Sequence, residues 1–204
     1  MDSFDKLKTL FESFPGIGPR QASRFVYFLL RKNPQYRHEL SERIRDIARD
    51  IKQCSTCQRF FPAESTRGNE CRICSDTSVD SSLLMLVERD SDLEAIHRSS
   101  VYNGKYFVLG GSLPILEKEP ERKIRINDLK RHLEHTGNSI SEIILAFSVT
   151  PQGEHTEEYI RETLAPLLSQ HSIKLSTLGR GVSTGTELEY ADKDTILHAF
   201  KGRK

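Results

Sequence analysis

The segment CSTCQRFFPAESTRGNECRIC, residues 54–74, contains all four cysteines of this 204-residue chain. Cys54 and Cys57 form one C-x-x-C pair, Cys71 and Cys74 form a second, and thirteen residues separate the pairs. Two such pairs supply four thiolates for a tetrahedral Zn²⁺, with no open position for catalysis. Disulfides and a redox C-x-x-C are the alternatives. Nothing in the sequence indicates export, and two pairs with no cysteine left over favour one structural Zn²⁺.

The cysteine segment is short, and we assign residues 54–78 to a zinc module. A module of about 25 residues cannot bury enough apolar surface to fold alone, so the metal must supply much of its folding free energy. Phe60, Phe61 and Pro62 lie between the two pairs. We expect these side chains to cover the metal cluster.

The chain before the cysteines, residues 1–53, has the pattern of helices. Apolar side chains recur at helical spacing in residues 4–14, in residues 22–29 and again in residues 40–51. Ser3 is placed to cap the first helix, and Pro19 suits the first turn of the second. We therefore predict a helical N-terminal domain.

The turn between the first two predicted helices, FPGIGPRQASR (14–24), has the composition of an anion site. Gly16 and Gly18 leave no side chain between the backbone and a ligand, and the exposed N–H groups at a helix start attract anions. Arg20 and Arg24 are four residues apart and share one helical face. The alternative, for this stretch taken alone, is a glycine-rich connection with surface arginines.

After residue 79 the hydrophobic pattern changes to that of an α/β domain. Short apolar runs at 82–88, 106–111 and 142–149, and a weaker run at 173–178, alternate with helical patterns. This alternation predicts a parallel sheet covered by helices, with functional residues at the C-terminal ends of the strands. The first strand ends at Glu88.

The net charge of +1 identifies no partner, but the charge is unevenly distributed. Residues 1–78 carry 14 Lys and Arg against 10 acidic residues, whereas the remainder carries 16 against 19. The basic half is compatible with a polyanion. The sequence shows no signal peptide and no apolar run long enough for a membrane span, so we expect a cytoplasmic protein.

Several motifs together resemble one known family. The strand ending LVE (86–88) and the segment ILAFSVTPQGEHTEEYI (144–160) resemble a Toprim domain, and the apolar-x-Gly-apolar-Gly turn resembles a helix-hairpin-helix motif. The order hairpin, four-cysteine module, Toprim domain, followed by GRGVSTGTELEYADKDTILHAF (179–200), is similar to the RecR family of bacterial recombination mediators. The resemblance covers essentially the whole chain.

The resemblance implies a multidomain α and α/β fold and a function. The implied domains are a helix-hairpin-helix domain (1–53), the four-cysteine zinc module (54–78), a Toprim domain (79–175) and a C-terminal oligomerisation arm (176–204). RecR proteins are non-catalytic, nucleoid-associated DNA clamps, assembled as rings of two or four subunits. They act with RecO and RecF to load RecA on single-stranded DNA. Arg20 and Arg24 correspond to the basic residues that face single- or double-stranded DNA, without regard to base sequence.

An enzymatic Toprim domain is the main alternative, as in a Mg²⁺-dependent nuclease or topoisomerase. Such an enzyme holds Mg²⁺ with a glutamate after the first strand and an Asp-x-Asp pair after a later strand. Glu88 matches the first element, but the later strand reads Phe147-Ser148-Val149-Thr150. We therefore interpret Glu88 as the remaining acidic position of a degenerate site. A zinc-dependent protein-interaction module with little DNA affinity is the third possibility.

Overall fold

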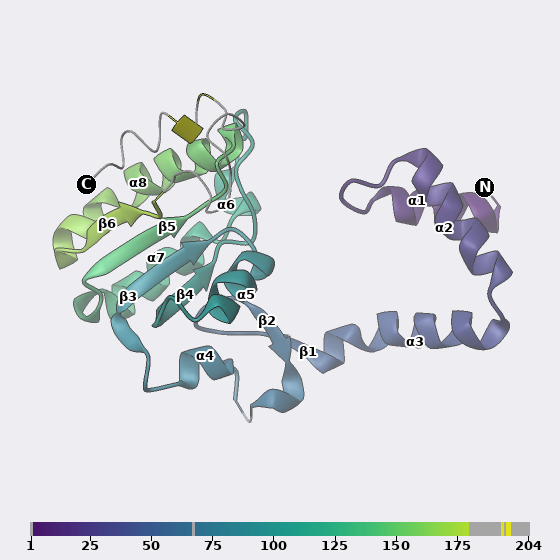
Figure 1. Cartoon of the computed structure of the whole chain (residues 1–204), viewed down its shortest axis with the longest axis horizontal. Helices are drawn as coiled ribbons and strands as arrows, with labels where there is room; N and C mark the ends of the chain where they lie inside the picture. Colours follow the sequence, from purple (N-terminus) through teal and green to yellow (C-terminus); the bar gives the residue numbers. More distant parts are fainter. Residues whose placement is uncertain (1, 67, 180–192, 194, 197–204) are drawn as a thin grey trace. The chain divides into compact units, whose positions relative to one another are not determined.

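The computed structural model describes residues 2–66, 68–179, 193 and 195–196 of the chain. The chain divides into two compact units between Ile51 and Lys52. The first unit is helical, and the second contains the cysteines and a four-stranded sheet (Figure 1). The combination of helices, cysteine cluster and parallel sheet confirms the predicted fold class. The finer division into four domains stays a prediction.

Three helices form the first unit: α1 (Ser3–Glu12), α2 (Pro19–Arg31) and α3 (Pro34–Asp50). Helices α1 and α2 pack together through rings, with Phe11 and Phe25 centroids 5.5 Å apart. Ala22 and Val26 of α2 are buried. The predicted cap of α1 at Ser3 is wrong, because the Asp2 carboxylate accepts the hydrogen bond from the Asp5 N–H, at 2.8 Å.

Helix α3 carries charges that largely neutralise one another. Arg45 lies 3.2 Å from Glu42, and Arg49 lies 2.9 Å from Asp50. Asn33 caps the helix by accepting from the Tyr36 N–H, at 2.8 Å. The polar face of α3 is therefore a solvated surface of paired charges.

The main sheet of the second unit has four parallel strands in the order β4-β3-β5-β6. These are β3 (Asp80–Val87), β4 (Gly104–Val108), β5 (Glu142–Ala146) and β6 (Lys174–Thr177). In register, Leu86 lies opposite Phe107 on one side and Leu145 on the other. All four predicted strands are therefore present and parallel.

Helices and shorter elements surround this sheet in Figure 1. The helices are α4 (Arg72–Ser75), α5 (Asp90–Ser99), α6 (Pro120–Lys123), α7 (Ile126–Thr136) and α8 (Pro151–His171), with the 3₁₀ turns η1 (Ala63–Ser65) and η2 (Gly137–Ser139). A small second sheet pairs β1 (Ile51–Gln53) with β2 (Phe60–Pro62).

The two faces of the main sheet bury different partners, because successive side chains of a strand point to opposite faces. Leu84 and Leu86 of β3 belong to a core shared with α7 and α8. Met85 and Val87 belong to a second core that contains the cysteines and Leu93 of α5. The cysteine segment therefore covers one face of the sheet.

Most of the predicted C-terminal arm, residues 176–204, lies outside the described residues. Among the residues that the structure does describe, no helix combines the length and apolar composition needed to cross a membrane.

Candidate functional site

The four cysteines come from two chain segments that the backbone brings together. Cys54 follows β1, and the chain turns back through Gln58, whose φ is +64° and whose N–H donates to the Cys54 carbonyl at 3.0 Å. Cys71 precedes α4 and Cys74 lies within it. Each C-x-x-C pair is thus a tight turn that points both of its sulfurs to one side.

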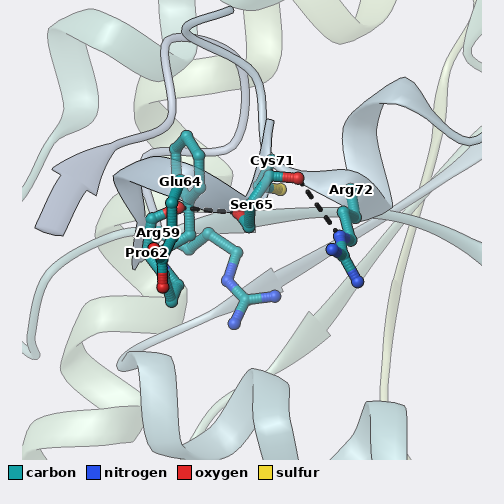
Figure 2. A pocket seen from close by; sticks show the side chains of 7 residues that line it. Arg59, Pro62, Glu64, Ser65, Cys71 and Arg72 are labelled. Atoms are coloured by element: carbon teal, nitrogen blue, oxygen red, sulfur yellow. Dashed lines mark hydrogen bonds between the residues drawn. The ribbon is translucent and has the colours of Figure 1, made fainter. Parts of the chain in front are cut away.

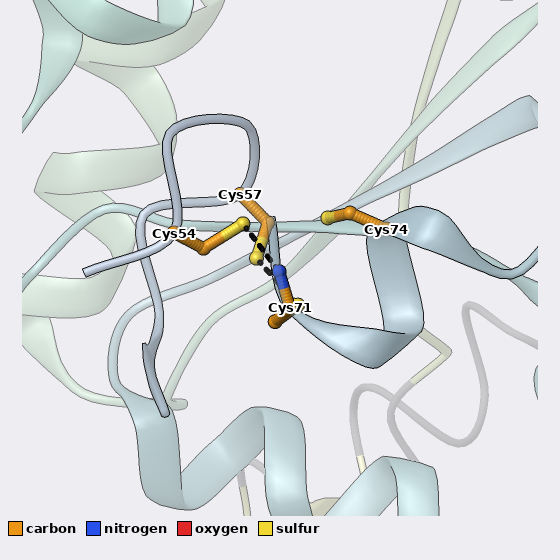
Figure 3. Close-up of side chains that lie close together, drawn as sticks. All are labelled: Cys54, Cys57, Cys71 and Cys74. Atoms are coloured by element: carbon orange, nitrogen blue, oxygen red, sulfur yellow. Dashed lines mark hydrogen bonds between the residues drawn. The ribbon is translucent and has the colours of Figure 1, made fainter. Parts of the chain in front are cut away.

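The sulfurs form one compact cluster (Figure 3). All four lie within 4.8 Å of one another, and the sulfurs of Cys57 and Cys71 are 3.6 Å apart. Zn–S bonds of about 2.3 Å in a tetrahedron place sulfurs about 3.8 Å apart. Cys54, Cys57 and Cys71 are buried, whereas Cys74 is partly exposed. The predicted ligands are therefore brought together in a geometry that fits one tetrahedral metal ion.

Hydrogen bonding within the cluster shifts the pKa values of two of the thiols in opposite directions. The bond between the side chains of Cys54 and Cys57 lowers the pKa of Cys54 and raises the pKa of Cys57. The backbone N–H of Cys71 also donates to the Cys54 sulfur, at 3.3 Å. Cys54 is thus stabilised as a thiolate, which is the form of cysteine that binds metals.

The cluster is fastened to β4 by bonds that sequence reasoning did not find. Val108 N–H donates to the Cys57 carbonyl at 2.9 Å. The Lys105 ammonium donates to the carbonyls of Ile73, Cys74 and Asp76 at 3.3, 2.9 and 2.7 Å. These partners lie some 30 to 50 residues beyond the cysteines in the chain, and no local sequence pattern marks them.

Arg125 makes a further link between the first cysteine pair and the sheet. Its guanidinium donates to the carbonyls of Gln58 and Val108, at 3.2 and 3.1 Å, and lies 5.7 Å from the centroid of the Phe60 ring. Phe60 is half exposed, whereas Phe61 is buried within the cysteine core. Of these two rings, Phe61 covers the cluster as predicted, and the expectation for Phe60 is wrong.

A pocket of about 560 Å³ adjoins the cluster (Figure 2). Cys71 forms part of its wall, together with Arg59, Arg72 and Glu64. Glu94 lies 3.7 Å from Arg59, and Arg72 donates to the Ser65 carbonyl at 3.3 Å. The lining itself carries two guanidinium groups and one carboxylate, and both guanidinium groups already have a partner within the protein.

The predicted hairpin lies on the exposed end of the first unit. Gly16 has a φ of +76°, a left-handed conformation that favours glycine, and Gly18 is the N-cap of α2. A Cβ atom at either glycine would meet nothing within 4 Å. The N–H groups of Gly16, Gly18 and Arg20 donate to no backbone carbonyl of the described chain. The turn therefore offers free amides to a ligand.

Arg20 and Arg24 extend from this turn into solvent. Neither makes a hydrogen bond or ion pair with any residue that the structure describes, in contrast to Arg45 and Arg49 of α3. The four hairpin residues thus lie together, and both guanidinium groups keep their full donor capacity.

Glu88, at the end of β3, is 2% exposed. Its carboxylate accepts hydrogen bonds from the Ser148 hydroxyl at 2.6 Å and the Ser148 N–H at 3.1 Å. Strand β5 ends at Ala146, short of the predicted residue 149. Ser148 occupies the position after this later strand where an acidic ligand would be needed.

The other acidic residues near Glu88 in sequence have separate roles. Asp90 accepts from the Phe60 N–H at 2.7 Å, and Asp92 accepts from the Arg89 N–H at 3.0 Å. Among the described residues, the four cysteines are the one group of three or more side chains placed to hold a metal ion. Within that part of the chain, no carboxylate cluster forms at Glu88.

Comparison with known proteins gives two domain matches and a set of full-length relatives. A Toprim domain matches residues 82–178, and the family described as RecR, C-terminal, matches residues 181–204. The recombination protein RecR of Francisella tularensis subsp. novicida is 35% identical over 201 residues, covering 97% of this chain and 94% of the relative. That of Dehalococcoides mccartyi is 36% identical, covering 100% and 91%. That of Syntrophotalea carbinolica is 34% identical, covering 99% and 96%.

Proposed function

This chain belongs to the RecR family of recombination proteins, and we propose that it is a non-catalytic DNA clamp of recombinational repair that grips the sugar–phosphate backbone through its N-terminal hairpin. The observation that carries the proposal is the pair of unpartnered guanidinium groups of Arg20 and Arg24 beside the free amides of Gly16 and Gly18, all within the described residues. Backbone amides and arginines hold phosphates without reading bases, so binding is independent of sequence.

The ion of the cysteine cluster is Zn²⁺ in this proposal. Four thiolates select a soft or borderline metal with tetrahedral geometry, and four sulfur ligands leave no open position for a substrate. The metal holds the two cysteine turns against β4, where Lys105 and the Val108 N–H bind the same segment. Its role is structural.

We infer the partners from the family, and they are part of this proposal. RecO and RecF bind the Toprim side of the protein, and together they help load RecA on single-stranded DNA in the cytoplasm. The C-terminal arm, residues 176–204, joins subunits into a ring, because one chain of 204 residues is too small to enclose DNA. The Toprim domain performs no phosphoryl transfer, since Glu88 is hydrogen-bonded to Ser148 and the described residues place no carboxylate cluster around it.

The hairpin assignment is tested by replacing Arg20 and Arg24 together with alanine and measuring DNA affinity against salt concentration. Each lost phosphate contact makes the plot of log affinity against log salt concentration less steep, by about 0.9 on duplex DNA or 0.7 on single strands. We therefore expect a reduction of about 1.8 or 1.4 for the two contacts together. The matched control is Arg45→Ala/Arg49→Ala, which removes the same charge from the same unit where carboxylates already neutralise it.

An unchanged affinity and slope in the Arg20→Ala/Arg24→Ala protein, with DNA still bound, would refute the hairpin assignment. The enzymatic alternative is tested on supercoiled plasmid with Mg²⁺. If the wild-type protein nicks or relaxes the plasmid and the Glu88→Gln protein does not, the chain is a Toprim enzyme and not a non-catalytic clamp.

A further inference from the structure

A row of basic and aromatic side chains continues from the hairpin along α2. Successive residues of a helix are turned by about 100°, so Arg20, Arg24 and Arg31 fall within about 40° of one another. Tyr27 lies within about 20° of the Arg20 direction. At a rise of about 1.5 Å per residue, the row from Arg20 to Arg31 is about 16 Å long.

The arginines of this row lie away from the buried side of α2, whereas Tyr27 reaches the Phe4 ring of α1. The buried residues Ala22 and Val26 point roughly 160° away from the row, into the contact with α1. All three arginines of the row are exposed, and Tyr27 is 54% exposed. None of the three guanidinium groups pairs with a residue in the described part of the chain. The row is therefore a cationic surface that contains one aromatic ring, that of Tyr27.

A single exposed ring needs no explanation by itself, so it is the position of Tyr27 within the row of arginines that matters here. Phe28, next to the row, is already used: the Lys32 ammonium lies 4.8 Å from its ring centroid and 5.4 Å from that of Tyr36. Tyr27 touches Phe4 of α1, with centroids 5.1 Å apart, and keeps half its surface open. Tyr27 is thus the ring of the row that is left to a ligand.

Resting on the proposed DNA function, we propose that this face of α2 is a single-stranded nucleic-acid platform, on which a base stacks against Tyr27 while Arg20, Arg24 and Arg31 hold the flanking phosphates. Bases in a duplex present only their edges, whereas an unpaired base offers its flat face to an aromatic ring. Cations spaced along the row match a ligand that carries a phosphate at every nucleotide. Arg31 and Tyr27 are the residues that this adds to the hairpin.

The test compares three labelled probes of equal length on the full, metal-loaded chain: oligothymidylate, a strand of abasic spacers, and a blunt duplex. The abasic strand has every phosphate and no base. We expect the wild-type protein to bind oligothymidylate about tenfold more tightly than the abasic strand, at the low end of one base stack. Equal affinity for these two strands would overturn the proposal without any mutation.

The variants separate stacking from charge. Tyr27→Ala should lose the preference for oligothymidylate, and Tyr27→Phe should keep it, because the ring remains. Arg31→Ala should weaken both single strands and lower the salt slope by about 0.7. Arg45→Ala, with its charge already paired, is the control.

Other outcomes identify what failed. If Arg20→Ala/Arg24→Ala weakens DNA binding while Tyr27→Ala and Arg31→Ala match wild type, the platform is wrong and the hairpin function stands. If none of these changes affects binding, the proposed function itself fails. If Tyr27→Ala lowers the oligomer mass in light scattering and weakens all three probes equally, a second copy of the chain covers this face, which also overturns the proposal.

Discussion

Replacing Ser148 by alanine removes the shorter of the two hydrogen bonds to Glu88. The Glu88 carboxylate is 2% exposed, and it accepts from the Ser148 hydroxyl at 2.6 Å and from the Ser148 N–H at 3.1 Å. In Ser148→Ala the buried carboxylate keeps the weaker, longer bond and gains no route to water. The folded state should therefore lose stability with little change in shape.

The size of the loss follows from the charge on the acceptor. A hydrogen bond to a charged group contributes about 1.5–3 kcal/mol to the free energy of unfolding. In a protein of this size each kcal/mol shifts the melting temperature by about 2–4 °C, so we expect a decrease of roughly 3–12 °C. Glu88→Gln removes the charge at nearly constant shape. The double variant should lose less than the sum of the single losses, with a coupling of about 0.5–3 kcal/mol.

Urea unfolding of the metal-loaded chain measures these free-energy differences, and it is followed by circular dichroism and by hydrogen exchange of the strands of the second unit. Ser169→Ala is the matched control, because Ser169 lies exposed on α8. A Ser148→Ala protein within about 0.5 kcal/mol of wild type, or additive losses in the cycle, would show that the Glu88–Ser148 bond does not stabilise the domain.

Three further changes test other parts of the structure. Removing the metal with a chelator should increase hydrogen exchange of β4 along with the cysteine segment, because both belong to one core; exchange confined to residues 54–74 would contradict this. Gly153→Ala should destabilise by about 1–3 kcal/mol in urea unfolding, because its Cβ would lie 2.0 Å from the Ser148 carbonyl oxygen, whereas Gly179→Ala, which meets nothing within 4 Å, should have no effect. Burial raises the pKa of Tyr102 above its ordinary value, so its contribution to stability is complete below about pH 10 and is lost as the pH rises beyond that. Ultraviolet titration should show this tyrosine ionising late, and an unchanged alkaline titration in Tyr102→Phe would refute the assignment.

The sequence predicted the elements of the fold because each is encoded locally. The continuous apolar runs identify the four strands, and Pro19 identifies the start of α2. The cysteine spacing identifies the metal cluster, since each pair needs only its own turn to bring two sulfurs together. Such signals depend only on residues that are close in sequence, so they can be recognised without the tertiary structure.

The support of the cluster could not be predicted, because it depends on contacts between distant residues. Lys105 reads as an ordinary charged residue at the start of an apolar run, yet it binds three carbonyls at the second cysteine pair. Arg125 stands within a highly charged segment and looks like a surface residue. The sequence also did not predict that Asp2 rather than Ser3 caps α1, because both residue types favour the N-cap position.

The order of these contacts along the chain affects how the protein is made. The cysteines leave the ribosome before Lys105, Val108 and Arg125, which later hold backbone carbonyls of the cysteine segment in place. During synthesis, then, four thiols are complete as a binding motif while the strand that shelters them has not yet been translated. Early capture of the metal would protect the nascent segment from oxidation until that strand arrives.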